Sequence, residues 1–211
     1  MIDDFAKEYL HGDLRYVRDT TLWKIEGLGE YDARRPLTPT GTNLLGLIKH
    51  LTITEAWYFG EVFGRPFPEP LPWRDDATDE RADDTLTALF DHKLQLADMW
   101  APEDESRVEI VDRYRRMCAH SDATIAALDI DAPGRVPWWP RPDVKLFNIM
   151  VHVLTETNRH AGHADILREQ LDGAVGAEAG SAALHGRDAT FWDNHRAKIE
   201  RAAKAADPAR S

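Results

Sequence analysis

The sequence predicts an all-α protein, a four-helix bundle with a crossover connection that is followed by a short C-terminal helix. Four long segments carry apolar residues at three- and four-residue steps, which is the repeat of one helix face. No segment alternates apolar and polar residues as a half-buried strand would. Long stretches of chain follow the second and third helices, and these permit a crossover instead of a strict up-down order.

The first two long helices are predicted at residues 3–27 and 43–63. Gly27 ends the first, and Thr42 is the expected N-cap of the second. Gly64 ends the second helix, because four prolines follow it within eight residues. The inward face of the first helix is predicted to comprise Phe5, Leu10, Leu14, Val17, Thr21, Leu22 and Ile25.

The third long helix is predicted at about 102–128, after an acidic loop at 73–84 and a short helix at 85–98. Pro102 suits the first turn of a helix, and the three acidic residues after it suit the positive end of the helix dipole. Its inward residues are expected to be Val108, Val111, Tyr114, Cys118, Ile125 and Leu128.

A fourth long helix is predicted at 144–172, closed by Gly173 and preceded by a proline- and tryptophan-rich loop. Residues 174–189 are rich in Gly, Ala and Ser and indicate a flexible connector to a last helix at 189–206. We therefore expect two parts. Residues 1–173 form the bundle, and residues 174–211 form a linker with a C-terminal helical appendage.

The net charge of the chain limits the classes of partner that we expect it to bind. It carries 37 acidic and 26 basic residues among 211, a formal net charge of −11. An acidic surface repels phosphate backbones and anionic lipids, so we expect neither nucleic acid nor membrane as a partner. The first residues lack the features of a signal peptide, and no apolar run approaches the roughly 20 residues that span a bilayer. These observations predict a cytoplasmic protein that acts on a small molecule.

Glu156 and His160 are the first candidate site residues. They lie four residues apart in the fourth long helix and project from the same side. On a helical wheel, His160 is in the centre of the apolar face and Glu156 is at its edge. Polar groups buried without partners cost several kcal/mol, and a divalent metal ion would be such a partner. The alternative is a hydrogen-bonded Glu–His pair without a metal.

His50 is a third candidate ligand, because it lies on the apolar side of the second helix beside Leu47 and Leu51. Gly162 follows His160 closely, and we interpret it as a position where another backbone approaches. The chain's single cysteine, Cys118, excludes a disulfide framework and cysteine-rich zinc modules. It is predicted to be a small buried hydrophobe.

Four segments of the sequence resemble the DinB-like superfamily, and more closely its actinobacterial branch related to mycothiol-dependent maleylpyruvate isomerase and thiol S-transferases. The resemblance covers about residues 5–173 and is carried by residues 41–51, 55–60, 136–139 and 151–168. It implies a four-helix bundle with a long crossover and a metal ion between helices. It also implies His50, Glu156 and His160 as the metal ligands.

The chemistry of that ligand set agrees with the resemblance. Two imidazoles and one carboxylate suit zinc first, and nickel, iron or manganese as alternatives. A metal ion of this kind can deprotonate a thiol at neutral pH. Because Cys118 lies in a different helix, the thiol would have to come from a cosubstrate. The resemblance implies a mycothiol-like compound of low molecular weight, used to conjugate or detoxify electrophiles.

Further residues near the motif are candidates of lower rank. His163 and Asp165 are further candidate site residues, and His163 is expected to act as a catalytic base or to support a metal ligand. His152 is a similar candidate, and the alternative for both histidines is a solvated residue on the helix edge. Trp138 and Trp139 are expected to line a cofactor or substrate pocket, the alternative being a cap on the end of the bundle. Trp57 and Tyr58 are expected in the core.

Two rival functions fit the same residues. The metal ion could activate water for hydrolysis, or the protein could be a non-catalytic, metal-stabilised bundle of a stress response. The resemblance implies S-transfer to, or isomerisation of, an electrophilic small molecule. The 38 residues after Gly173 are fewer than the C-terminal domain of the isomerases, which weighs against the isomerase reaction for this chain. We expect the tail helix either to cover the cavity or to form the contacts of a homodimer.

Overall fold

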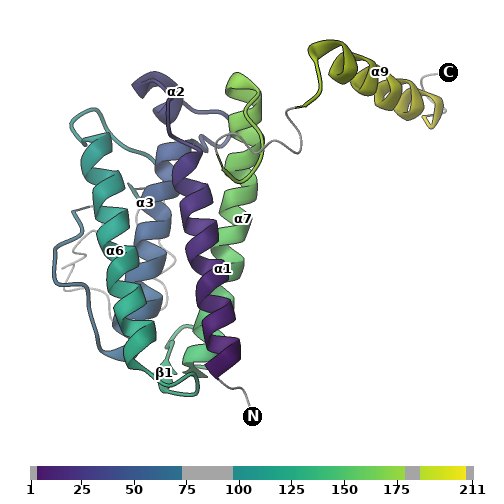
Figure 1. Ribbon diagram of the computed structural model, residues 1–211. Helices are drawn as coiled ribbons and strands as arrows, with labels where there is room; N and C mark the ends of the chain where they lie inside the picture. Colours follow the sequence, from purple (N-terminus) through teal and green to yellow (C-terminus); the bar gives the residue numbers. More distant parts are fainter. Residues whose placement is uncertain (1–3, 73–96, 179–185, 208–211) are drawn as a thin grey trace. The chain divides into compact units, whose positions relative to one another are not determined.

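Four long helices form the body of the protein, as the sequence predicts (Figure 1). The structure is a computed structural model, and it describes residues 4–72, 97–178 and 186–207. The bundle helices are α1 (Asp4–Trp23), α3 (Leu44–Glu55), α6 (Arg107–Ala127) and α7 (Leu146–Asp172). The turns η1 (Ala56–Gly60) and η2 (Glu61–Phe63) extend α3, and α2 (Glu30–Arg34) is a short helix between α1 and α3.

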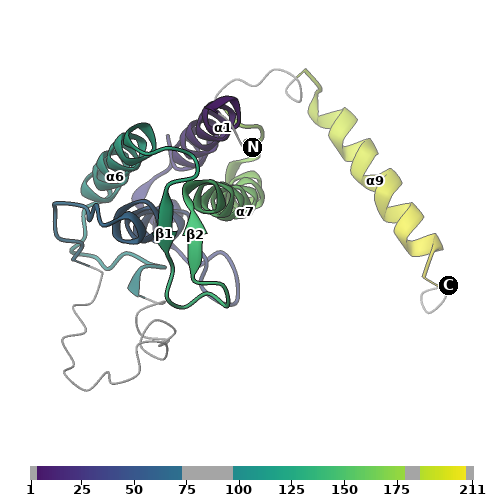
Figure 2. The same cartoon turned by 90° about the horizontal axis from the view of Figure 1, so that it is seen from below.

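The packing order shows the predicted crossover. Helices α1 and α3 each pack against both α6 and α7, so α1 and α3 lie on a diagonal (Figure 2). Arg65, just beyond α3, contacts His120 and Thr124 near the end of α6, while Asn43, at the start of α3, contacts Met99, shortly before α6. Helices α3 and α6 therefore run in the same direction, and the chain between them crosses from one end of the bundle to the other.

Helix α7 illustrates how the sequence specifies its fold. Its buried residues recur at three- and four-residue steps, so one continuous face packs against α1 and α3. Gly173 ends the helix in the left-handed conformation, with φ of 76°, which glycine adopts without steric cost. Arg168 donates to the carbonyl groups of Lys24 and Glu26 and joins the ends of α7 and α1. The buried residues of α7 are Leu146, Ile149, Met150, Val153, Thr157, Ala161, Ala164, Leu167 and Arg168.

A buried ion pair crosses the diagonal of the bundle. The guanidinium group of Arg18 in α1 donates two hydrogen bonds, of 2.7 and 2.6 Å, to the carboxylate of Glu55 in α3. Arg18 also donates to Asp122 in α6 at 2.6 Å. Arg18 and Glu55 are 3% and 1% exposed. Burial lowers the pKa of Arg18, but the charge of Glu55 outweighs burial and raises it well above its ordinary value. Arg18 thus keeps its charge inside the core.

Several predicted boundaries are wrong, each for a local reason. The N-cap of α3 is Asn43, not Thr42, because the Asn43 side chain accepts a hydrogen bond from Gly46 N. Helix α6 begins at Arg107 instead of Pro102, since Ser106 caps it. The predicted helix at 43–63 is α-helical only to Glu55. It then continues as a π-helical turn, η1, and a 3-10 turn, η2.

Other differences concern what periodicity cannot detect. The hairpin of β1 (Pro133–Arg135) and β2 (Asp143–Lys145) was not predicted, because three-residue strands carry too few residues for an alternating pattern. Helix α2 was also missed, because a helix of five residues is too short to show a periodic apolar pattern. Phe5 and Val108, both predicted inward, are each 69% exposed and lie in the first turns of their helices. The loop expected at 73–84 and nearly all of the helix expected at 85–98 lie outside the described residues.

The chain divides into two compact units, Met1–Ala174 and Val175–Ser211. The second unit contains α9 (Ala189–Ala205), whose N-cap Asp188 accepts a hydrogen bond from Phe191 N at 2.8 Å. No residue of α9 is buried. Within the described residues, no helix combines the length and the hydropathy needed to cross a bilayer.

Candidate metal centre

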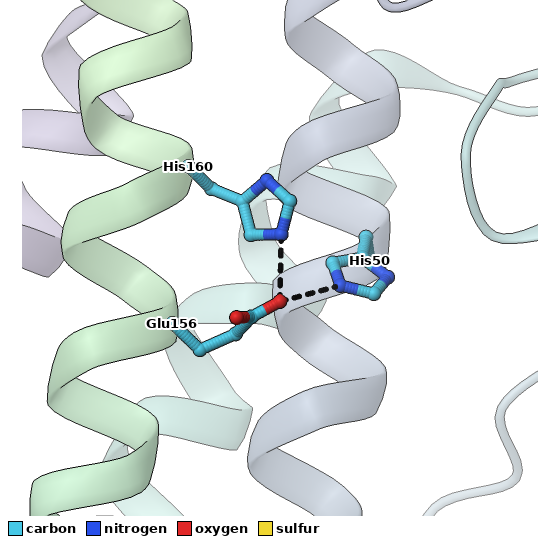
Figure 3. Close-up of side chains that lie close together, drawn as sticks. All are labelled: His50, Glu156 and His160. Carbon is cyan, nitrogen blue, oxygen red and sulfur yellow. Dashed lines mark hydrogen bonds and ion pairs between the residues drawn. The ribbon is translucent and has the colours of Figure 1, made fainter.

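Three side chains converge between α3 and α7. His50 projects from α3, and Glu156 and His160 project from α7, one turn apart (Figure 3). One ligand atom from each residue lies within 4.8 Å of the others. Glu156 Oε1 is 2.9 Å from His160 Nε2 and 3.7 Å from His50 Nε2. The rings of the two histidines meet edge to face, with centroids 4.8 Å apart. The structure therefore brings together the three residues that the sequence nominated.

The three residues lie at the edge of the α3–α7 interface. The side chains of His50, Glu156 and His160 are 25%, 27% and 12% exposed. The sequence placed His160 in the centre of the packed face, but Thr157, Ala161 and Ala164 occupy that position. An edge position leaves the triad open to a small molecule from solvent, which a fully buried centre would not.

The triad is strongly coupled electrostatically. Hydrogen bonds from His160 and His50 hold the pKa of Glu156 far below its ordinary value, although burial opposes them. Burial lowers the pKa of His50, but hydrogen bonds to Asp98 and Glu156 outweigh it and raise this pKa to about 9. Without a metal ion, Glu156 is a carboxylate that two imidazole rings face. A divalent cation can take the place of the proton between these groups.

Asp98 is a site residue that the sequence did not indicate. Its Oδ2 lies 2.8 Å from Nδ1 of His50, on the side of the ring that faces away from Glu156. It is only 6% exposed. Asp98 is 48 residues from His50 in the sequence and belongs to no periodic pattern. Only the fold places the two side by side.

The lower-ranked histidines lie on either side of the triad. The ring of His163 is 5.4 Å from that of His160 and is exposed to solvent. Burial and the neighbouring charges of His160 and Arg159 lower the pKa of His163. His152 lies one turn before Glu156, and partial burial lowers its pKa. Asp165 pairs with the buried amine of Lys24 at 2.5 Å, so its contact is with the turn that follows α1.

Trp138 and Trp139, in the loop of the hairpin, belong to an aromatic cluster. The ring of Trp139 is 4.8 Å from His152 and 5.8 Å from Tyr58, and Trp138 is 5.4 Å from Trp57. All five are partly buried, so Trp57 and Tyr58 are not the fully buried core residues that we expected. Because His152 is one turn from Glu156 on α7, the cluster adjoins the triad along that helix. That the two tryptophans line a pocket stays a prediction.

Gly162 and Cys118, which the sequence also singled out, have no part in the triad. Gly162 is exposed, and a Cβ there would meet no atom of the described residues within 4 Å, so the predicted close backbone approach is wrong. Cys118 lies on α6 beside Tyr114 and packs against the core, but the residue is partly buried and not fully buried as predicted. Burial of its thiol raises the pKa far above the ordinary range. A hollow of about 390 Å³ is lined by Ala56, Glu61 and residues 67–71 and contains none of the triad.

Comparison with known families agrees with this geometry. The profile of the family described as mycothiol-S-transferase matches residues 9–173, which include the whole bundle apart from the first turn of α1 and all three residues of the triad. The chain belongs to the mycothiol-S-transferase family. No curated protein matches it. As a mycothiol-S-transferase family member, it belongs to the DinB-like group that the sequence motifs indicated.

The donor set of this family member suits a divalent metal ion. Imidazole nitrogen and carboxylate oxygen are common zinc ligands, and three protein ligands leave a coordination position free in catalytic zinc sites. Asp98 adds a carboxylate that holds the far nitrogen of a ligand histidine, which is the usual surrounding of a metal-bound imidazole. The residues that are present therefore fit a metal centre.

Proposed function

We propose that the chain is a metal-dependent transferase that joins a mycothiol-like thiol of low molecular weight to an electrophilic small molecule. The convergence of His50, Glu156 and His160 within 4.8 Å, in a chain of the mycothiol-S-transferase family, carries this proposal. A divalent cation in that position would supply the positive charge that lowers the pKa of a thiol. Zinc is the first candidate, with nickel, iron and manganese as alternatives.

The charges of the three proposed ligands determine the net charge of the site. Glu156 brings one negative charge, and the two imidazoles bring none when neutral, so the site keeps a net positive charge with a divalent ion. Such a charge attracts a thiolate, the nucleophilic form of sulfur. The exposed edge of the triad gives a cosubstrate access, while α3 and α7 hold the ligands on rigid elements.

The nucleophilic sulfur comes from the cosubstrate. Cys118 is a poor nucleophile because burial keeps its thiol protonated, and it contacts Tyr114 on α6. In the proposed transfer, the cosubstrate sulfur forms a bond to an electrophilic carbon, and a leaving group departs with the pair of electrons that bound it. In an isomerisation, the sulfur would later leave the carbon again. The thiol proton passes to a base or to water.

His163 is the proposed base. Its pKa is lowered, so the imidazole is neutral near pH 7 and can accept a proton. It is exposed beside His160, between the ligand and solvent. We further propose that Trp138 and Trp139, with Tyr58 and His152, form an aromatic wall against which an apolar substrate rests. Conjugation of toxic electrophiles is the biological setting that this chemistry suits.

The test combines metal analysis with thiol-dependent turnover. The purified protein should hold about one divalent ion per chain, and conversion of electrophiles should require an added thiol such as mycothiol. A cobalt-substituted sample should change its visible absorption when the thiol is added. Turnover that does not depend on thiol would replace the proposal with a hydrolase. A full metal content without activity on a broad electrophile panel would leave only a metal-stabilised bundle.

A further inference from the structure

We propose that Asp98 is the positioning residue of the metal centre. It fixes the ring of His50 so that Nε2, and not Nδ1, faces the other two ligands. This inference rests on the metal-binding role proposed above. It adds a residue, and the segment that carries it, which neither the sequence motifs nor the family assignment indicates.

The hydrogen bond between Asp98 and His50 determines which nitrogen can bind a cation. A carboxylate only accepts hydrogen bonds, so Nδ1 of His50, 2.8 Å from Asp98 Oδ2, carries the proton. The lone pair of a neutral imidazole is then on Nε2. That atom is the one directed at Glu156, at 3.7 Å. The bond also stops rotation of the ring, because Asp98 is 6% exposed and held in the packed interior.

The segment that carries Asp98 is bound to α3 at several points. Lys49, the neighbour of His50, is fully buried, and its amine donates to the carbonyl groups of Ala97 and Trp100 at 3.0 and 2.7 Å. The same amine pairs with Glu105 at 2.7 Å. The two carbonyls are on either side of Asp98 in the sequence, so Lys49 anchors both ends of its segment.

Two residues at the start of α3 also hold residues 97–100. Asn43 donates to the carbonyl oxygen of Met99 at 3.1 Å. A Cβ at Gly46 would overlap with that carbonyl group, so the absence of a side chain lets the segment lie directly on the helix. Asn43, Gly46 and His50 are spaced three and four residues apart and share one face. One face of α3 therefore places residues 97–100, and this segment places the ring of His50.

If Asp98 only stabilised the fold, both oxygens of its carboxylate would be expected to have hydrogen-bond partners. The second oxygen of Asp98, Oδ1, is buried and has no hydrogen-bond partner among the described residues. A buried carboxylate with only one oxygen satisfied is costly, and a histidine that binds a cation through its other nitrogen is the partner that offsets this cost. Residues that hold a metal-bound histidine in this way change metal affinity by roughly 10–100-fold when they are replaced.

The experiment measures zinc affinity by competition with a chromophoric chelator, in the full chain. Asp98→Ala should bind zinc about 10–100-fold more weakly than the wild type. Asp98→Asn should fall between the two, because its amide oxygen can still accept from Nδ1 of His50. Asp172→Ala is the matched control, since Asp172 pairs with Arg168 at the end of α7 and should leave the affinity unchanged.

A nitrogen-15 NMR spectrum of His50 gives a second readout, which loss of stability alone would not change. In the zinc-loaded wild type the proton should be on Nδ1 and the metal on Nε2, and Asp98→Ala should lose this single tautomer. If Asp98→Ala fails to fold, Asp98→Asn decides. Unchanged affinity in both variants, with a wild type that binds zinc, would overturn this inference alone. A wild type that binds no divalent ion would overturn it together with the proposed function.

Discussion

At the residue scale, the carboxyl group of Glu156 connects the two helices of the site. It accepts from His160 on its own helix at 2.9 Å and faces His50 on α3 at 3.7 Å. Its pKa is far below its ordinary value, so it is charged at neutral pH. A carboxylate that lies between two histidines binds a cation more readily than it binds a neutral ligand.

Replacement of His160 tests the ligand assignment. His160→Ala removes one of three ligands, so zinc affinity should fall by more than the roughly 10–100-fold that loss of a supporting residue costs. The metal-loaded protein should also lose thermal stability, because metal binding no longer favours the folded state. The measurement is elemental analysis with a thermal melt in the presence and absence of zinc. Unchanged metal content would remove His160 from the site.

His163→Gln is the matched variant three residues away. If His163 is a base and not a ligand, this change leaves the metal content intact and lowers thiol-dependent kcat/KM by roughly 10²-fold. The ratio should be measured at several pH values, because loss of a base removes the corresponding limb of the pH profile. Wild-type activity in this variant would return His163 to the role of a solvated residue on the edge of α7.

Cys118 provides a prediction that separates the two possible sources of thiol. Burial raises the pKa of this thiol far above the ordinary range, and the thiolate is the reactive form. The folded protein should therefore not react with a thiol reagent such as iodoacetamide at pH 8, and the unfolded protein should react fully. Cys118→Ala should keep thiol-dependent turnover. Rapid labelling of the folded chain would show that Cys118 is a nucleophile of the protein.

At the element scale, the buried pair of Arg18 and Glu55 ties the diagonal helices together. Among the residues that the structure describes, Glu55→Ala leaves the buried Arg18 guanidinium with Asp122 as its one acidic partner, so the free energy of unfolding should fall by about 3–5 kcal/mol. Urea denaturation measures the change. Asp112→Ala is the control on α6, because the Asp112–Arg115 pair is exposed and should contribute less than about 1 kcal/mol. Equal effects of the two changes would contradict a structural role for the buried pair.

Two glycines within the bundle helices should respond in opposite directions to the same substitution. Gly46→Ala places a methyl group against the carbonyl of Met99, and it should destabilise the fold by about 1–3 kcal/mol. Gly162→Ala meets no atom, so it should stabilise α7 by about 0.5–1 kcal/mol through helix propensity. Thermal melts of the two variants measure both changes. A stable Gly46→Ala protein would show that residues 97–100 do not lie against α3.

At the scale of the whole molecule, the sequence predicted what periodicity and spacing encode. The four long helices follow from apolar repeats. Spacing and apolar faces made Glu156, His160 and His50 candidates, and the family resemblance selected them together as the ligand set. Asp98 and the exposed position of Gly162 could not be predicted, because each depends on which distant segment packs there. Caps were misplaced by one to five residues, since Thr42 and Asn43 are both good N-caps and only the backbone selects between them.

The tail unit provides the last test. Residues up to Ala174 form a compact unit of their own, so we expect a protein that ends at Ala174 to unfold cooperatively with a midpoint within about 3 °C of the full chain. It should also bind the same amount of zinc. The apolar residues Phe191, Trp192 and Ile199 are 40%, 37% and 56% exposed, and their replacement by serine in the full chain is the matched control. If both changes lower the midpoint by more than about 8 °C, α9 covers apolar surface of its own bundle or of a second copy. Light scattering then separates these cases, because only a homodimer that depends on α9 would lose half of its mass.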